Sequence, residues 1–247
     1  MIKTLKNLIS FLTILPVGMS EDCLKDAAEH MYLFPIIGAL IGSIGGAMAL
    51  LLSFFLPNII VGGLTCGFIL LLTGLHHVDG LLDFGDGLMC HGPPDRKIKA
   101  MHDVNTGTGG LTLGLITILT TAFCISQLGK NIVFQALVVA ETTAKLSMVV
   151  LARMGRSAHE GMNTYFVNAM HSSHGNLKLL IALGLSIIIG LSVLGMMGIL
   201  MIVMGFILAT VMLLISNNQF GGITGDVMGA TNELTRMFSL IVAIPSL

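Results

Sequence analysis

The sequence predicts an all-α protein, a polytopic membrane helix bundle that forms one integral-membrane domain over residues 1–247. Hydrophobic residues make up 54% of the chain, whereas Asp, Glu, Lys and Arg make up only 10%. An ordinary soluble domain carries about 25% charged residues. Several apolar runs also reach the ~20 residues that a helix needs to cross the ~30 Å hydrocarbon core of a bilayer.

Composition also excludes several classes of function. The net charge of −1 supplies no basic field for phosphate backbones, so we expect no nucleic-acid partner. The cysteines are far apart and none forms a CxxC pair, so the sequence predicts neither a disulfide framework nor a thiolate metal site. The expected environment is a lipid bilayer, and whether the chain forms a homo-oligomer is left open.

We expect about seven transmembrane helices. Four lie in the apolar runs 31–55, 59–75, 111–128 and 132–152. The run 177–215 is about twice as long, so we divide it into two helices near Gly195 and Gly198. The seventh follows Gly221 and reaches Leu247.

Residues 1–18 are expected to form an amphipathic helix that lies in the membrane interface, because the apolar run 8–17 is too short to cross. A secretory signal peptide is the alternative, although no small-residue cleavage site follows. The polar residues that recur at helical spacing on one side are Lys3, Lys6, Asn7, Ser10 and Thr13, with Leu5, Leu8, Ile9 and Leu12 largely opposite.

The distribution of basic residues predicts the orientation, since Lys and Arg favour cytoplasmic loops. With the N-terminus in the cytoplasm, only Lys130 lies outside, while Lys145 and Arg236 fall within spans. The polar loops 76–110 and 153–176 then share the cytoplasmic face of the cell membrane, where we expect the active site. The cytoplasmic set is Lys3, Lys6, Lys25, Arg96, Lys97, Lys99, Arg153, Arg156 and Lys178.

A stripe of carboxylates follows the second span. If residues 76–87 are helical, Asp79, Asp83 and Asp86 lie at i, i+4 and i+7, within about 60° of one another on one face. Like charges this close resist ionisation unless a cation compensates them, and ligands that offer only oxygen favour Mg²⁺. A solvated acidic helix end, or pairing with Arg96, Lys97 and Lys99, is the alternative.

Two more polar clusters carry candidate site residues. Asp103, Gly107 and Thr108 precede a span, where free backbone N–H groups at a helix N-terminus can bind phosphate. Thr224, Asp226 and Glu233 open the last span, and ionisable groups within spans are functional candidates. Helix capping explains most of these residues nearly as well, but not Glu233. Mid-span Glu141 and Lys145, at i and i+4, are interpreted as an ion pair, and a role facing substrate is the alternative.

These motifs resemble those of the cobalamin synthase family, the adenosylcobinamide-GDP ribazoletransferases, over nearly the whole chain. Arg153 and the pair Glu160-Gly161 also match the family. The most specific matching segments are 77–87 (HVDGLLDFGDG) and 221–226 (GGITGD), preceded by 11–16 (FLTILP) and 34–38 (FPIIG). The family's usual Asp-Ser-Arg reads Asp-Val-Asn at 103–105, and its central Ser-Arg pair is replaced near Lys145.

The resemblance implies a membrane enzyme that joins adenosylcobinamide-GDP to α-ribazole, or to its 5′-phosphate, and releases GMP, with Mg²⁺ as cofactor. For this reaction we assign Asp79, Asp83 and Asp86 to the metal and to catalysis, with His77 as the candidate general base and Asp226 to a second ion or to orienting water. A carboxylate that the metal leaves free is the alternative base. Expected substrate-binding residues are Asp103, Gly107, Thr108, Arg153, Thr224, Asp226 and Glu233.

Two other functions use similar residues. Other membrane transferases of diphosphate substrates, such as CDP-alcohol phosphotransferases and prenyltransferases, carry comparable Asp-rich stripes. The CDP-alcohol pattern needs Ala-Arg where Leu82-Asp83 stands here. A divalent-cation transporter is the alternative that is not an enzyme, but it should place its carboxylates near the middle of the membrane in broken helices.

Overall fold

The computed structural model describes residues 2–18 and 20–244. Within these ranges no β-strand forms, and the all-α class is confirmed. The helices in chain order are α1 (Ile2–Leu12), α2 (Cys23–Glu29), the 3₁₀ helix η1 (Met31–Leu33), α3 (Phe34–Leu52), α4 (Asn58–Leu72), α5 (His76–Met89), α6 (Pro94–Met101), α7 (Thr108–Gln127), α8 (Val133–Met154), α9 (Met162–Met170), α10 (Gly175–Leu194), α11 (Met196–Phe220) and α12 (Gly225–Ala243).

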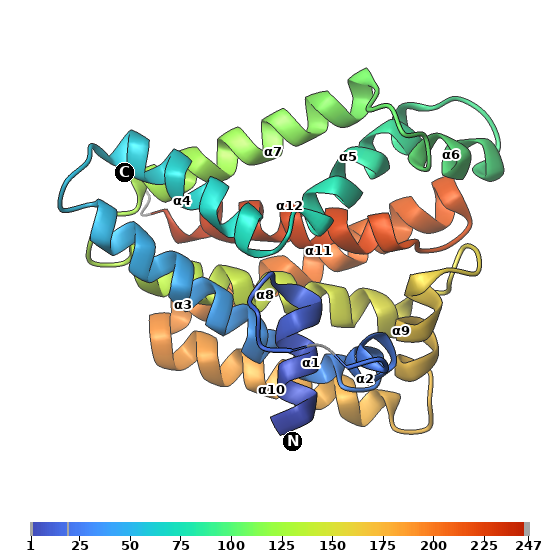
Figure 1. Cartoon of the computed structure of the whole chain (residues 1–247), viewed down its shortest axis with the longest axis horizontal. Helices are drawn as coiled ribbons and strands as arrows, with labels where there is room; N and C mark the ends of the chain where they lie inside the picture. Colours follow the sequence, from blue (N-terminus) through green and yellow to red (C-terminus); the bar gives the residue numbers. More distant parts are fainter. Residues whose placement is uncertain (1, 19, 245–247) are drawn as a thin grey trace.

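The long helices run along the longest axis of the molecule, and the short helices α2, α6 and α9 gather toward one end (Figure 1). Helix α8 lies at the centre and packs against α3, α10, α11 and α12. Its side chains are buried without interruption from Ala136 to Ala152. This central position places the polar residues of α8 inside the bundle rather than against lipid.

Five helices are long and apolar enough to cross a membrane within the described ranges, and α4 with α5 makes a sixth if the bent pair is one span. The expected count of seven is not confirmed. Two expected spans account for the difference. Helix α4 has only 15 residues unless it is counted together with α5. Helix α12 carries Asp226, Glu233 and Arg236, and the residues after 244 lie outside the described ranges. The five helices are η1 with α3, α7, α8, α10 and α11.

A sharp break separates α4 from α5, whose axes differ by 96°. Gly74 and Leu75 both have positive φ, at 66° and 62°, so the chain leaves the helical path there. The backbone N–H of Ile14 donates to the carbonyl of Leu72 at 2.9 Å and satisfies one group that the break exposes. The segment 76–110, predicted as a loop, therefore holds two helices, and α5 does not continue the preceding span.

The predicted helix within residues 1–18 is confirmed as α1, but two residues of the expected polar face, Asn7 and Thr13, are buried. The side chain of Asn7 is 1% exposed and donates to Asp26 at 2.8 Å. Its Oδ1 also accepts from Ser20. Helix α1 thus packs on α2 along this side, because the buried amide finds its partners there.

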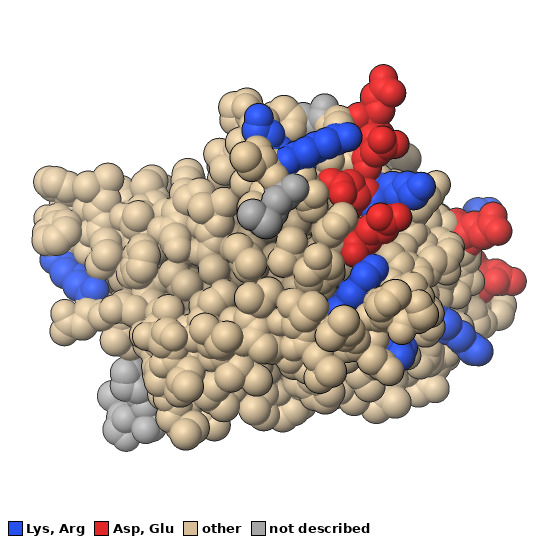
Figure 2. All heavy atoms as spheres, turned by 90° about the horizontal axis from the view of Figure 1, so that it is seen from below, with Lys and Arg blue, Asp and Glu red and all other residues tan. Residues whose placement is uncertain are grey.

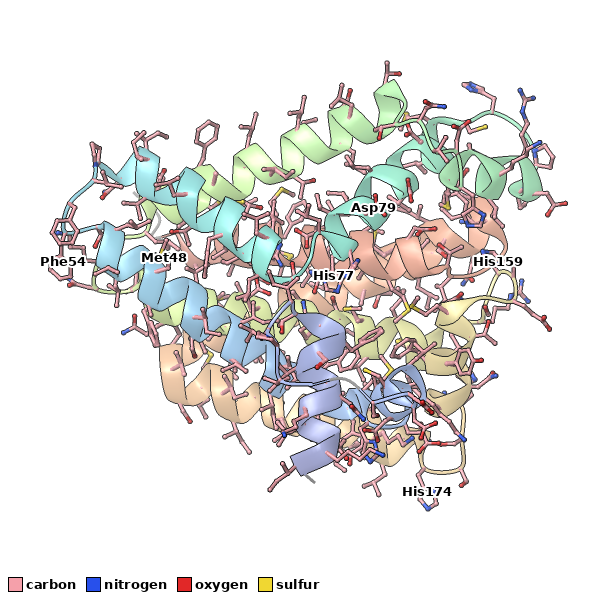
Figure 3. The ribbon with its side chains drawn as sticks, viewed as in Figure 1. Met48, Phe54, His77, Asp79, His159 and His174 are labelled. Atoms are coloured by element: carbon pink, nitrogen blue, oxygen red, sulfur yellow. The ribbon has the colours of Figure 1, made fainter. Side chains whose placement is uncertain are left out.

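Charged side chains gather toward one end of the face shown in Figure 2, and a broad uncharged surface covers most of the rest. At the far end, Lys130 lies over the ring of Phe54, 4.8 Å from its centroid (Figure 3). Exposed apolar residues such as Leu115, Ile188 and Phe206 occupy the outer faces of α7, α10 and α11. A polar end and an apolar flank are the surfaces that a bilayer-embedded bundle needs.

Candidate active site

The predicted carboxylate stripe lies on one helix, because Asp79, Asp83 and Asp86 all belong to α5. The side chain of Asp79 is exposed, and those of Asp83 and Asp86 are half-buried. Helix α5 runs from the break at Leu75 toward the end that holds α6, with Asp79 near its start (Figure 3). The stripe therefore begins at the bend and extends toward the polar end.

Close packing of α5 on α12 brings a fourth carboxylate to the stripe. A Cβ added to Gly80 would lie 2.9 Å from the Cα of Asp226, and one added to Gly229 would lie 3.0 Å from the carbonyl oxygen of His77. Among the carboxylates, Asp226 has the largest electrostatic effect on Asp83, ahead of Asp79 and Asp86. Two motifs more than 130 residues apart thus form one acidic centre.

The carboxylate of Asp86 turns toward α7 instead. Its oxygens accept the backbone N–H of Gly107 at 2.6 Å and that of Gly110 at 2.8 Å. These are charge-assisted bonds to the N-terminus of a helix, where a negative charge is favoured. Gly107 was expected to offer its N–H to substrate phosphate, but that donor is already used. Helix geometry leaves the N–H groups of Thr108 and Gly109 without an intrahelical partner.

Within the described ranges, no three His, Cys, Asp or Glu side chains are placed to share a metal ion. The structure thus does not bring Asp79, Asp83 and Asp86 to one point. Mg²⁺ commonly takes one or two carboxylates and completes its shell with water and substrate phosphates. The donor set around Asp79, Asp83 and Asp226 is all carboxylate oxygen and fits that mode of binding.

His77, the expected general base, lies in the first turn of α5 and is 7% exposed. Its Nδ1 atom is buried and has no hydrogen-bond partner among the described residues. The backbone of His77 contacts Gly229 of α12. Its role as the base stays a prediction, since the ring faces the protein interior.

The remaining expected substrate residues fall in different places. Thr224 caps α12 by accepting from the N–H of Val227 at 3.2 Å, and its hydroxyl donates to Asp226 at 3.3 Å. Arg153, at the end of α8, donates from Nε and Nη2 to the side chain of Asn176 at 3.1 and 2.7 Å. Thr224 lies beside the acidic centre, whereas the guanidinium of Arg153 is bound at the start of α10.

Glu233 lies two turns deeper in α12 and belongs to a buried network between α8 and α12. It pairs with Arg236, which also pairs with Glu141. Lys145 lies 3.8 Å from Glu141 and donates to Asn232 at 2.6 Å. The predicted pairing of Glu141 with Lys145 is confirmed, and two acids balance two bases. This pairing explains Glu233 without a substrate, and the Lys145 side chain is fully buried, which favours the ion pair over a role facing substrate.

An open pocket of about 650 Å³ lies beside the acidic centre, and sequence reasoning missed most of it. His102 and His159 meet edge to face in its wall, with ring centroids 5.4 Å apart, and His102 is the nearby base with the largest electrostatic effect on Asp226. Only Asp103 was predicted as a site residue. The pocket is lined by Asp95, Ile98, Lys99, His102, Asp103, Val104, Ala158 and His159.

Comparison with known proteins identifies the family. The model of the cobalamin-5-phosphate synthase family matches residues 4–244. The chain belongs to this family. It is 36% identical to the adenosylcobinamide-GDP ribazoletransferase of Methanocella arvoryzae, over 96% of this chain and 93% of that protein. It is 32% identical to the enzyme of the same name from Pyrococcus abyssi, over 96% of both chains.

The relative from Methanococcoides burtonii carries the same name and is 32% identical over 96% of this chain and 90% of its own length. No solved structure matches the chain. Membership of the family therefore rests on sequence similarity over residues 4–244. The positions of the site residues relative to one another come from the packing of α5, α7 and α12 described above.

Proposed function

We propose that this chain is a membrane-bound adenosylcobinamide-GDP ribazoletransferase that performs the final joining step of cobalamin biosynthesis. A hydroxyl of α-ribazole, or of its 5′-phosphate, attacks the phosphorus that carries the adenosylcobinamide. The bond from this phosphorus to the GMP oxygen breaks, and GMP leaves. The products are GMP and adenosylcobalamin or its 5′-phosphate.

The observation that carries the proposal is the approach of Asp226 to the stripe of α5 through Gly80 and Gly229. Four carboxylates in one region repel each other and the diphosphate, so the site needs a divalent cation when substrate binds. One or two of the carboxylates of Asp79, Asp83 and Asp226 would hold Mg²⁺, with water and substrate phosphates completing its shell. When bound, this ion would neutralise the phosphate oxygens during transfer.

Other groups of the chain position the substrates. The free N–H groups of Thr108 and Gly109 point from the N-terminus of α7 and can bind a phosphate oxygen. Asp86 holds that terminus against α5. The proton of the attacking hydroxyl passes to His77 or to a carboxylate that the metal leaves free.

We place the polar end of the bundle at the cytoplasmic face of the cell membrane. Nucleotide and corrinoid substrates are charged or large, and an open surface suits them better than an enclosed cavity. The transporter alternative gains no support, because the acids inside the bundle, Glu141 and Glu233, are both paired with Arg236.

The test measures GMP release by the purified protein in lipid nanodiscs, with adenosylcobinamide-GDP and α-ribazole 5′-phosphate together and with each alone. We expect release only with both substrates, and its loss when Mg²⁺ is chelated. Asp79→Asn should reduce release by more than 100-fold while the protein still inserts in membranes. Asp22→Asn, at an exposed residue before α2, is the matched control. Unchanged release by Asp79→Asn would refute the metal assignment.

A further inference from the structure

The open pocket between α6 and residues 158–159 has side chains that suit a planar aromatic ligand. The imidazoles of His102 and His159 supply aromatic surface, and imidazole is among the side chains on which nucleobases stack. Ile98 and Val104 add apolar surface, and Val104 is 98% exposed, so nothing in the described chain covers it. Lys99 adds a cation for a phosphate.

The carboxylate of Asp103 is a hydrogen-bond acceptor in the wall of this pocket. Asp103 is held by Asn105, whose backbone N–H and side-chain amide both donate to Oδ1 at 2.9 and 3.0 Å. These bonds lower the pKa of the Asp103 carboxyl below its usual range, so the group is an anion at neutral pH. No hydrogen bond engages its Oδ2 among the described residues, which leaves an acceptor for a ligand.

His159 holds a buried nitrogen without a partner at the wall of the pocket. Its Nδ1 lies 2.9 Å from the carbonyl oxygen of Glu160. Because a carbonyl only accepts, Nδ1 carries the proton, and Nε2 of the neutral ring is an acceptor. This Nε2 atom is buried and has no partner in the part of the chain that the structure describes.

The pocket also lies within reach of the acidic centre. Asp103 is four residues from Gly107, whose N–H bonds to Asp86, so at most ~14 Å of extended chain separates the two positions. His102, in the wall of the pocket, also has an electrostatic effect on Asp226. A nucleoside whose phosphates lie at the carboxylates of α5 can therefore extend into the pocket.

We propose that this pocket binds the guanine nucleotide of the donor substrate and that Asp103 recognises the guanine base through hydrogen bonds. Guanine presents two neighbouring donors, N1–H and the N2 amino group, and the free Oδ2 of Asp103 has two lone pairs with which to accept from both. The base of α-ribazole has no such donors, and adenine has a single amino group beside an acceptor. This inference rests on the proposed function, because it assigns a place to the GMP portion of its substrate.

The test is direct binding of GMP, IMP and XMP to the purified protein in nanodiscs with Mg²⁺, by isothermal titration calorimetry. Wild-type protein should bind GMP about tenfold or more tightly than IMP, which lacks the N2 amino group and so loses one hydrogen bond to a charged group. XMP, which has a carbonyl at C2, should bind still more weakly because it faces the carboxylate with an acceptor.

Asp103→Asn gives a result that damage to the fold cannot produce. The amide places an NH2 donor where the free oxygen stood, and this donor complements the C2 carbonyl of xanthine but not the amino group of guanine, so the variant should prefer XMP to GMP. Asp22→Asn should keep the wild-type preference. If Asp103→Asn still prefers GMP to XMP, the assignment of Asp103 is overturned. If Asp95→Asn prefers XMP to GMP instead, the guanine contact belongs to Asp95.

Failure of this inference and failure of the proposed function are distinguishable. If wild-type protein releases GMP from the two substrates but binds GMP no more tightly than IMP, the guanine assignment is wrong and the function stands. If GMP binds with the expected preference but no transfer occurs, the proposed function fails and the nucleotide site stands.

Discussion

At the scale of single residues, the three aspartates of the α5 stripe have different surroundings. Asp79 is exposed at the bend, Asp83 faces Asp226, and Asp86 is bonded to α7. Spacing along a helix predicted that they share a face, and it could not separate their roles. That difference depends on α7 and α12, whose approach is set by contacts far away in sequence.

Asp86→Ala should destabilise the protein more than it alters its use of Mg²⁺. The change leaves the N–H groups of Gly107 and Gly110 without their acceptor and should cost about 1–3 kcal/mol of unfolding free energy. Thermal unfolding in detergent measures the loss. The Mg²⁺ concentration at half-maximal residual activity should stay at the wild-type value, whereas Asp83→Asn should raise it. A raised requirement in Asp86→Ala would make Asp86 a metal ligand.

At the scale of helices, glycines determine how closely the elements of the site approach. Gly80 and Gly229 let α5 meet α12, and Gly85 lets α5 meet α7, since a Cβ at Gly85 would lie 2.8 Å from the Cα of Gly110. The sequence motifs place these glycines beside the aspartates. Composition alone predicts close packing, but not which helix each glycine faces.

Gly80→Ala should lower the rate of GMP release by about tenfold or more. The new methyl group meets the backbone of Asp226 at 2.9 Å, so α5 and α12 must separate, and small displacements of catalytic groups have large effects on rate. Gly67→Ala is the matched control, because its Cβ would meet nothing within 4 Å. Equal rates for the two variants would show that the contact of α5 with α12 does not position the site.

The network between α8 and α12 makes a second prediction at this scale. Arg236→Met leaves Glu141 and Glu233 without their shared partner and should lower the unfolding free energy by about 3–5 kcal/mol. Adding Glu233→Gln removes one charge of each sign and should restore part of that loss. Denaturant unfolding in mixed micelles measures both variants. No recovery in the double variant would contradict a charge-balanced network.

At the scale of the whole molecule, the sequence predicted the all-α class and most of the long helices. It could do so because the hydrocarbon core of a bilayer requires apolar runs of about 20 residues, which are visible in the sequence. It did not predict the 96° break at Gly74 and Leu75, the helix α6, or the histidine pair His102 and His159. These features arise from contacts between distant segments, such as Ile14 with Leu72, which leave no periodic signal.

The orientation can be tested with a cysteine already in the chain. Cys90 is half-exposed after α5, whereas Cys23, Cys66 and Cys124 are buried. A membrane-impermeant maleimide should label Cys90 in inside-out vesicles and not in right-side-out vesicles. Lys130→Cys in a Cys90→Ser background should show the reverse. Labelling of Cys90 from the external side would place the acidic centre outside the cell.

The short length of α4 has a consequence for the surrounding lipid. Its 15 residues rise about 22 Å, less than the ~30 Å of an average hydrocarbon layer. Bilayers adapt to such a mismatch by thinning at modest cost. If α4 alone crosses the hydrocarbon layer, the leaflet beside the break is drawn inward, and headgroups and water dip toward the first turn of α5. Longer acyl chains would make that dip more costly, which links turnover to membrane thickness.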